Sequence, residues 1–277
     1  MNNSLKYKFK LITVLDLLFL MLLAISGSFE GGTSSLLYYL AFTVPIIIGI
    51  TNISELRKDA TKKEEIAYLI SDFRIEWKEL LLALPLFAPV IYANAGISIG
   101  TEYIFSLFGK TNPMTVTEGF FTALVLHALI PAVLEELLFR YVPIKLLGDS
   151  PRYAILLSSV AFAFAHASLF QIPYALVAGI AFAALYLMTG SIIPSLLLHF
   201  INNAVSLISI FGYGEGWLTL LGLTSLAASL IIIVIFRKPY LKRLHNLFSE
   251  RIRDLPLSPL IFIGVSLLIA VTSLIAQ

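Results

Sequence analysis

The sequence predicts an all-α, polytopic bundle of eight to nine transmembrane helices, and three observations support this fold class. Of the 277 residues, 58% are hydrophobic and only 13% are charged, whereas soluble domains carry about 25% charged residues. The apolar residues fall into nine runs. The basic residues gather in alternate connections between those runs. A water-soluble fold would have no place for this much apolar surface.

Nine apolar runs divide the chain into predicted helices. A hydrocarbon core about 30 Å thick is crossed by roughly 20 apolar residues in a helix, whose backbone groups are satisfied internally. In chain order the runs are Leu11–Ser28, Ser35–Ile53, Leu80–Gly96, Phe120–Leu147, Tyr153–Leu169, Ile172–Thr189, Ile192–Phe211, Trp217–Phe236 and Leu257–Ala276. Several runs are short, and the third or the last could be re-entrant, so an eight-span bundle stays open. We treat residues 1–277 as a single integral membrane domain with a motif-bearing core at 117–212.

The basic residues predict the orientation, because Lys and Arg accumulate in the cytoplasmic connections of membrane proteins. With the N-terminus in the cytoplasm, alternation of the nine runs places 18 of the 19 Lys and Arg residues inside. Only Lys110 is then outside. We therefore expect a multi-pass cell-membrane protein with a cytoplasmic N-terminus.

Composition also excludes several kinds of chemistry. The chain has no cysteine, so disulfides, a thiol nucleophile and thiolate metal ligands are all excluded. Its net charge of +2 gives no reason to expect nucleic acid as a partner. The predicted partners are the lipid bilayer and whatever binds to polar groups inside it.

A few polar side chains lie within the predicted spans, where each ionisable group costs at least about 2.5–3.5 kcal/mol at the helix centre. Six of them lie in three runs: Glu135, Glu136 and Arg140 in the fourth, His166 in the fifth, and His199 and Asn203 in the seventh. At a rise of about 1.5 Å per residue, Glu135 and His166 lie at nearly equal depth from the connection between their runs. His199 and Asn203 lie at comparable depth, so the four groups are expected to meet.

The spacing within the fourth and seventh runs suggests separate roles. Glu136 and Arg140 are four residues apart with the acid first, the favourable order for an ion pair on a helix. Glu135 projects about 100° away and is left free to act as a general base, with His166 as its proton partner. His199 and Asn203 share a helix face and could donate hydrogen bonds to an oxyanion.

A purely structural interpretation stands beside this one. Polar side chains in helical bundles often serve as interhelical hydrogen-bonding groups, which applies most readily to the pair of Glu136 and Arg140. It explains four polar groups at matching depth less well, because burying them in lipid is costly. His127 matches no motif, and we interpret it as a packing histidine.

Three motifs in these runs resemble those of a known family. Glu135–Arg140 reads EExxxR, Phe162–His166 reads FxxxH and His199–Asn203 reads HxxxN. In this order on separate hydrophobic helices, they resemble the CPBP family of CAAX proteases and bacteriocin-processing enzymes. That family includes the Ras-converting CAAX prenyl endopeptidases.

The resemblance implies an eight-helix bundle whose conical cavity opens to the cytoplasm and the membrane. It assigns activation of a water molecule to Glu135 and His166, and stabilisation of the oxyanion to His199 and Asn203. Glu136 and Arg140 would then shape the site or position the substrate. The expected activity is intramembrane hydrolysis of a peptide bond near the C-terminus of a membrane-anchored substrate, including one of the prenylated CAAX type.

Three alternatives remain open at this stage. The same Glu and His groups could form the relay of a proton-coupled transporter, or the chain could be a non-catalytic membrane scaffold or bacteriocin-immunity protein. We expect no metal. A zinc ion bound by Glu135, His166 and His199, a possible set of two His and one carboxylate, is the alternative.

Overall fold

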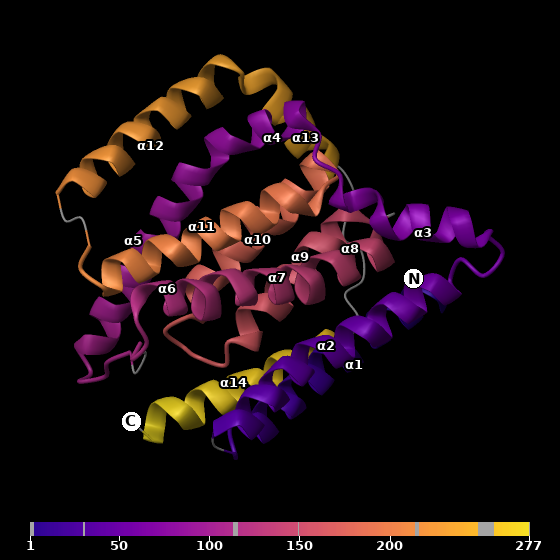
Figure 1. Cartoon of the computed structure of the whole chain (residues 1–277), viewed down its shortest axis with the longest axis horizontal. Helices are drawn as coiled ribbons and strands as arrows, with labels where there is room; N and C mark the ends of the chain where they lie inside the picture. The colour runs from indigo at the N-terminus through magenta and orange to yellow at the C-terminus, as the bar shows by residue number, and fades with distance from the viewer. Residues whose placement is uncertain are drawn as a thin grey trace.

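The structure, a computed structural model, describes residues 3–29, 31–112, 116–148, 150–213, 216–248 and 258–276. These residues are largely helical and contain no β-strand, which confirms the all-α class (Figure 1). The helices are α1 (Asn3–Ser26), α2 (Gly31–Glu55), α3 (Lys62–Ile70), α4 (Trp77–Ala83), α5 (Phe87–Ser106), α6 (Phe120–Ala123), α7 (Ile130–Glu136), α8 (Val142–Leu147), α9 (Pro151–Ala165), α10 (Ile172–Thr189), α11 (Ile192–Ile210), α12 (Trp217–Ile235), α13 (Arg237–Phe248) and α14 (Ser258–Ala276).

Each of the nine apolar runs contains an apolar helix, although not all are long. Within the described residues, six helical segments are long and apolar enough to cross a membrane. α12 and α13, bent by 80°, make a seventh if they count as one span. α9 and most of α14 are shorter apolar helices. Leu257, the first residue of the last predicted run, lies outside the described residues.

α10 occupies the centre of the bundle, where it packs against α5, α9 and α11. Its contact with α9 is close because Gly179 leaves room for a neighbouring backbone. A Cβ atom at Gly179 would lie 3.0 Å from the Cα of Ser159. Small residues permit such close approach in lipid, where packing rather than hydrophobicity selects the partner. On the other side of α9, α1 and α2 pack together and contact α8.

The segment Phe120–Leu147 is helical but is not a regular α-helix. Two π-helical stretches, Leu124–Leu129 and Leu137–Tyr141, join α6, α7 and α8. Each ends shortly before a proline, Pro131 or Pro143. A proline inside a helix lacks an N–H donor and clashes with the carbonyl four residues earlier, which favours a wider turn there. π-Helical turns are frequent at functional sites, and the second one follows the two glutamates directly.

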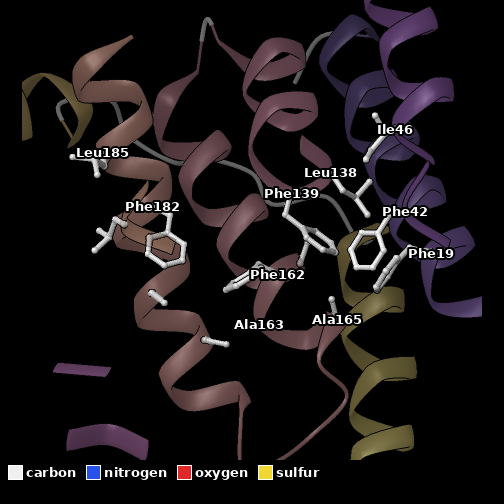
Figure 2. Close-up of a cluster of buried hydrophobic side chains, with 14 of the residues drawn as sticks. Phe19, Phe42, Ile46, Leu138, Phe139, Phe162, Ala163, Ala165, Phe182 and Leu185 are labelled. Atoms are coloured by element: carbon white, nitrogen blue, oxygen red, sulfur yellow. The ribbon is translucent and has the colours of Figure 1, made fainter. Parts of the chain in front are cut away.

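A chain of aromatic rings links α1 and α2 to the helices around α10 (Figure 2). The ring of Phe19 lies 4.7 Å from that of Phe42 and 5.5 Å from that of Phe139. Phe139 contacts Phe162 at 6.0 Å, and Phe162 contacts Phe182 at 6.2 Å. This buried core supports the polar residues of the fourth run from behind.

The helix connections fall at two ends of the bundle (Figure 1). We call one the basic end: it holds the start of α1, the segment with α3, and the connections α8–α9, α10–α11 and α12–α13. We call the other the cavity end: it holds the connections α1–α2, α5–α6, α9–α10 and α11–α12. Lys110 is the only basic residue of the sequence between Lys78 and Arg140, and it belongs to the cavity end.

Polar contacts close the basic end. Lys145 Nζ, whose side chain is 4% exposed, donates to Asp72 Oδ1 at 2.8 Å and to the carbonyl of Tyr68 at 2.7 Å. The hydroxyl of Tyr186 donates to Asp72 Oδ2 at 2.5 Å. These bonds tie the segment after α3 to α8 and α10. α13 is tied in the same way, because Arg243 contacts both carboxylate oxygens of Glu79 at 2.5 and 2.9 Å.

Candidate active site

The polar centre of the bundle is built around Glu136, which is fully buried. Its Oε1 atom accepts a hydrogen bond from His199 Nδ1 at 2.9 Å and lies 3.6 Å from Arg140 Nε. The hydroxyl of Ser195 donates to its Oε2 atom. The predicted pair of Glu136 and Arg140 is therefore present, and α11 adds two further partners.

Arg140 is also fully buried, and aromatic rings share its surroundings with Glu136. Its Cζ atom lies 3.8 Å from the centre of the Phe162 ring and 5.3 Å from that of Phe182. A guanidinium this close to the face of an aromatic ring is attracted by the ring quadrupole. Its three side-chain nitrogens make no hydrogen bond in the described part of the chain, so the 3.6 Å contact with Glu136 and the ring faces compensate its charge.

Glu135, one residue earlier, faces a different environment. Its side chain is 15% exposed and lines a cavity. Its Oε2 atom lies 3.4 Å from His199 Nε2. His199 is therefore placed between the two adjacent carboxylates, with one ring nitrogen toward each. The expectation that Glu135 is the glutamate outside the pair with Arg140 agrees with this geometry.

Stacking fixes the ring of His199. It lies parallel to the ring of Phe182 with centroids 4.7 Å apart, and edge-on to Phe162 at 5.5 Å. Because Nδ1 is bonded to a carboxylate, it carries a proton, and Nε2 is the nitrogen presented to Glu135 and the cavity. Such a carboxylate contact sets both the tautomer and the orientation of an imidazole.

His166 comes from the end of α9, which terminates at this residue. Its Nδ1 atom lies 2.8 Å from the carbonyl oxygen of Phe162. Since a carbonyl can only accept, Nδ1 is the donor and Nε2 is left with a lone pair in the neutral ring. His166 and Glu135 line the same cavity but share no direct hydrogen bond among the described residues. The imidazole in contact with Glu135 is that of His199, not that of the expected partner His166.

The cavity above these groups has a volume of about 1210 Å³. The predicted residues Glu135, His166, His199 and Asn203 all line it, whereas Glu136 and Arg140 lie beneath its floor. His127 also lines it and bonds through Nε2 to Glu118 Oε2 at 3.3 Å.

Sequence reasoning missed two polar residues near the site, Ser195 and Asn94. Ser195 bonds to Glu136, and Asn94 of α5 donates to Asn202 Oδ1 at 3.1 Å beside the cavity. Ser195 was detectable, because it lies one helical turn before His199 on the face shared with Asn203. Asn94 had no such signal, since only the packing of α5 brings it to α11.

The cavity opens at the cavity end of the bundle. Its outer lining comes from that end, including Ser26, Ser34, Thr111, Glu118, Gln171 and Ile210. None of its described lining residues belongs to 40–90, 136–161 or 183–198. The sequence predicted a cytoplasmic N-terminus together with a site open to the cytoplasm. In this structure the start of α1 and the residues that line the cavity mouth lie at opposite ends of the bundle, and which end faces the cytoplasm stays a prediction.

The zinc alternative requires Glu135, His166 and His199 to converge. Only Glu135 and His199 are in contact, and within the described residues no group of three His, Asp or Glu side chains is arranged to bind a metal ion. Nδ1 of His199 is bonded to Glu136, and Nδ1 of His166 to a carbonyl. The residues present do not form the ligand set of this alternative.

These features define a helical membrane protein with a carboxylate–imidazole centre at the floor of a large cavity. Residues 117–205, about a third of the chain, match the family model described as type II CAAX prenyl endopeptidase Rce1-like. The match includes all three motifs and confirms the resemblance to the CPBP family of CAAX proteases. The matched segment is therefore similar to the corresponding part of CAAX-type proteases. No curated protein and no solved structure matches the chain.

Proposed function

We propose that the protein is an intramembrane endopeptidase in which Glu135 activates a water molecule to hydrolyse a peptide bond near the C-terminus of a membrane-anchored substrate. One observation carries this proposal: Glu135 and His199 lie 3.4 Å apart at the floor of a cavity that His166 and Asn203 also line. A carboxylate and two imidazoles therefore face one cavity within the predicted spans, where ionisable groups are costly unless they have a function. General acid–base catalysis uses such groups.

The first step is attack by water on the carbonyl carbon of the substrate. In our proposal Glu135 accepts a proton from the water as the C–O bond forms, and the Nε2 lone pair of His166 accepts a hydrogen bond from the same water and orients it. The carbonyl π electrons move to the oxygen, which becomes an oxyanion. Removing a group that transfers a proton in the transition state typically costs about 10²–10⁴-fold in rate.

The oxyanion would be stabilised by His199 and Asn203. A doubly protonated His199 donates Nδ1–H to Glu136 and Nε2–H toward the cavity, while the amide of Asn203 approaches from one turn further along α11. As the tetrahedral intermediate collapses, the C–N bond breaks and the leaving amine takes the proton from Glu135. The direct products are a carboxylic acid and an amine, which become a carboxylate and an ammonium group when the acid proton passes to the amine, and the enzyme returns to its starting protonation state.

Glu136, Arg140 and Ser195 act as positioning residues in this scheme. They touch His199 or Glu136 beneath the floor rather than the cavity itself. Their role is to hold the imidazole in one orientation, so that its Nε2 atom stays directed at the reacting carbonyl. Such preorganised donors stabilise developing charge without reorganising during the reaction.

The test is cleavage of a farnesylated CAAX reporter peptide by the purified protein in detergent, where both ends of the bundle are accessible. We expect Glu135→Gln and His166→Ala each to reduce kcat at least about 10²-fold. Asp59→Asn, which neutralises an exposed carboxylate at the basic end, is the matched control and should retain the wild-type rate. Unchanged turnover in Glu135→Gln would rule out the proposed base.

A further inference from the structure

The basic residues and the cavity mouth lie at opposite ends of the bundle, and this arrangement bears on which side of the membrane the site serves. Three segments contain no Lys or Arg at all: 11–56, 153–236 and 254–277. The segment 79–139 contains only Lys110. Most Lys and Arg residues in the described part of the chain therefore lie at the basic end, where the connections bearing them predict the cytoplasm.

No described lining residue of the cavity comes from that end. Below the floor lie fully buried Glu136 and Arg140, and beyond them the bonds of Lys145 with Asp72 and Tyr68 close the space between α3 and α8. α13 covers the end of α10, where Arg243 also donates to the carbonyl of Met188. A cytoplasmic substrate would have to cross this packed layer to meet Glu135.

The opposite end is open and hydrophilic. Its lining is rich in hydroxyl and amide side chains, including Ser26, Ser34, Thr111, Asn112 and Gln171, and the Ser26 hydroxyl donates to the carbonyl of Ser34. Two carboxylates, Glu102 and Glu118, and one cation, Lys110, also line it. This mouth is suited to a polar, extended chain that is neutral or slightly basic.

We infer that the cavity opens to the extracytoplasmic side of the membrane and that its substrate is an exported peptide held at that surface by a lipid or transmembrane anchor. The substrate class rests on the proposed peptidase function, whereas the sidedness does not. From Ile210, the last residue of α11, to His199 is 11 residues, or about 16 Å. An extended chain at about 3.3 Å per residue needs roughly five residues to reach the floor.

The absence of cysteine from the chain allows a direct test of sidedness with single-cysteine variants. Thr111→Cys places a thiol at the exposed rim of the mouth, and Asp59→Cys places one on an exposed turn at the basic end. In intact cells a membrane-impermeant maleimide should label Thr111→Cys, and should label Asp59→Cys only after permeabilisation. The reverse pattern, or equal labelling of both, would overturn the inference.

A second arm tests the substrate class with a lipid-anchored reporter peptide added to sealed membrane vesicles. The reporter carries its scissile bond at least five residues from any folded domain. We expect right-side-out vesicles to cleave it at least tenfold faster than inverted vesicles, and detergent to remove the difference. Faster cleavage by inverted vesicles would overturn the inference. No cleavage even in detergent, with Thr111→Cys labelled from outside, would reject the peptidase and its substrate while sidedness stands.

Discussion

The two ends of this bundle differ in how they use polar residues. At the basic end, polar side chains bond to one another: Lys145 to Asp72, and Arg243 to Glu79. At the cavity end, polar side chains of α5, α7, α10 and α11 face a volume of about 1210 Å³. Buried polar groups that are fully paired make a structure rigid, whereas groups that face a cavity are available to a ligand.

The boundary between the ends passes between two adjacent residues. Glu136 faces the paired side and is fully buried, whereas Glu135 faces the cavity and is 15% exposed. His199 touches both. Two adjacent glutamates can therefore have different roles, Glu136 in stability and Glu135 in the proposed catalysis. Substitutions on the paired side should lower the free energy of unfolding, whereas substitutions on the cavity side should lower activity.

The largest effect on stability is expected for Glu136→Gln. This change leaves Arg140 buried without its anionic partner, and breaking a buried ion pair costs about 3–5 kcal/mol in the free energy of unfolding. Thermal unfolding in detergent should show a large decrease in Tm together with loss of peptidase activity.

Glu135→Gln is the matched comparison, since it makes the same change one residue earlier. It should leave Tm close to the wild-type value and remove only activity. Equal losses of stability in the two variants would contradict the division between the sides.

Lys145→Met tests the basic end. The substitution keeps the apolar part of the side chain but leaves Asp72 without its cation, so we expect a loss of about 2–3 kcal/mol. Activity of the folded fraction should stay within threefold of wild type. A double-mutant cycle with Asp72→Asn measures the coupling, and additive effects would show that the two side chains do not interact.

Arg243→Lys should have a smaller effect. Lysine cannot reproduce the two-oxygen contact with Glu79, but the pair is partly exposed, at 30% and 22%, so the expected loss is at most about 1 kcal/mol. Arg237→Lys, an exposed position on the same helix, is the control for the change of residue type. A decrease in Tm as large as that of Lys145→Met would indicate that α13 is held more firmly than its exposure suggests.

The smallest effect is a pH dependence at the mouth. Backbone hydrogen bonding, with His127 contributing, lowers the pKa of Glu118 from 4.5. A group whose pKa is lowered by folding stabilises the protein above its unfolded pKa, and loses that contribution as pH falls through its folded pKa. The Tm of wild type should therefore exceed that of Glu118→Gln slightly at pH 7, and the difference should shrink as the pH falls below 4.5. A constant difference would refute this assignment.

Much of the fold could be predicted because lipid imposes simple rules on the sequence. Apolar length identified the helices, and their existence was correct where the runs are long, as in Phe120–Leu147. The end of α9 at His166 was not predicted, since the run stays apolar to Leu169 while the backbone turns, with Ala167 at a φ of 46°. The two π-helical turns of the fourth run were not predicted, although each ends shortly before a proline.

The sequence predicted which residues would gather around the cavity better than it predicted which of them would be in contact. Spacing of four residues correctly paired Glu136 with Arg140, because that contact lies within one helix. The contact of Glu135 with His199 depends on how α7 and α11 face each other, which no local pattern encodes. The side on which the cavity opens likewise depends on which helices diverge, and hydropathy carries no information about that.

The π-helical turn at Leu137–Tyr141 has a consequence for sequence length. It accommodates one more residue than an α-helical turn would. Deleting a single residue there would let the helix close regularly and rotate the glutamates by about 100° relative to α8. Glu135 would then turn away from the cavity. If the missing residue is Tyr141, the EExxxR motif stays intact, so a one-residue gap at that position of a homologue would mark a protein with altered or abolished chemistry.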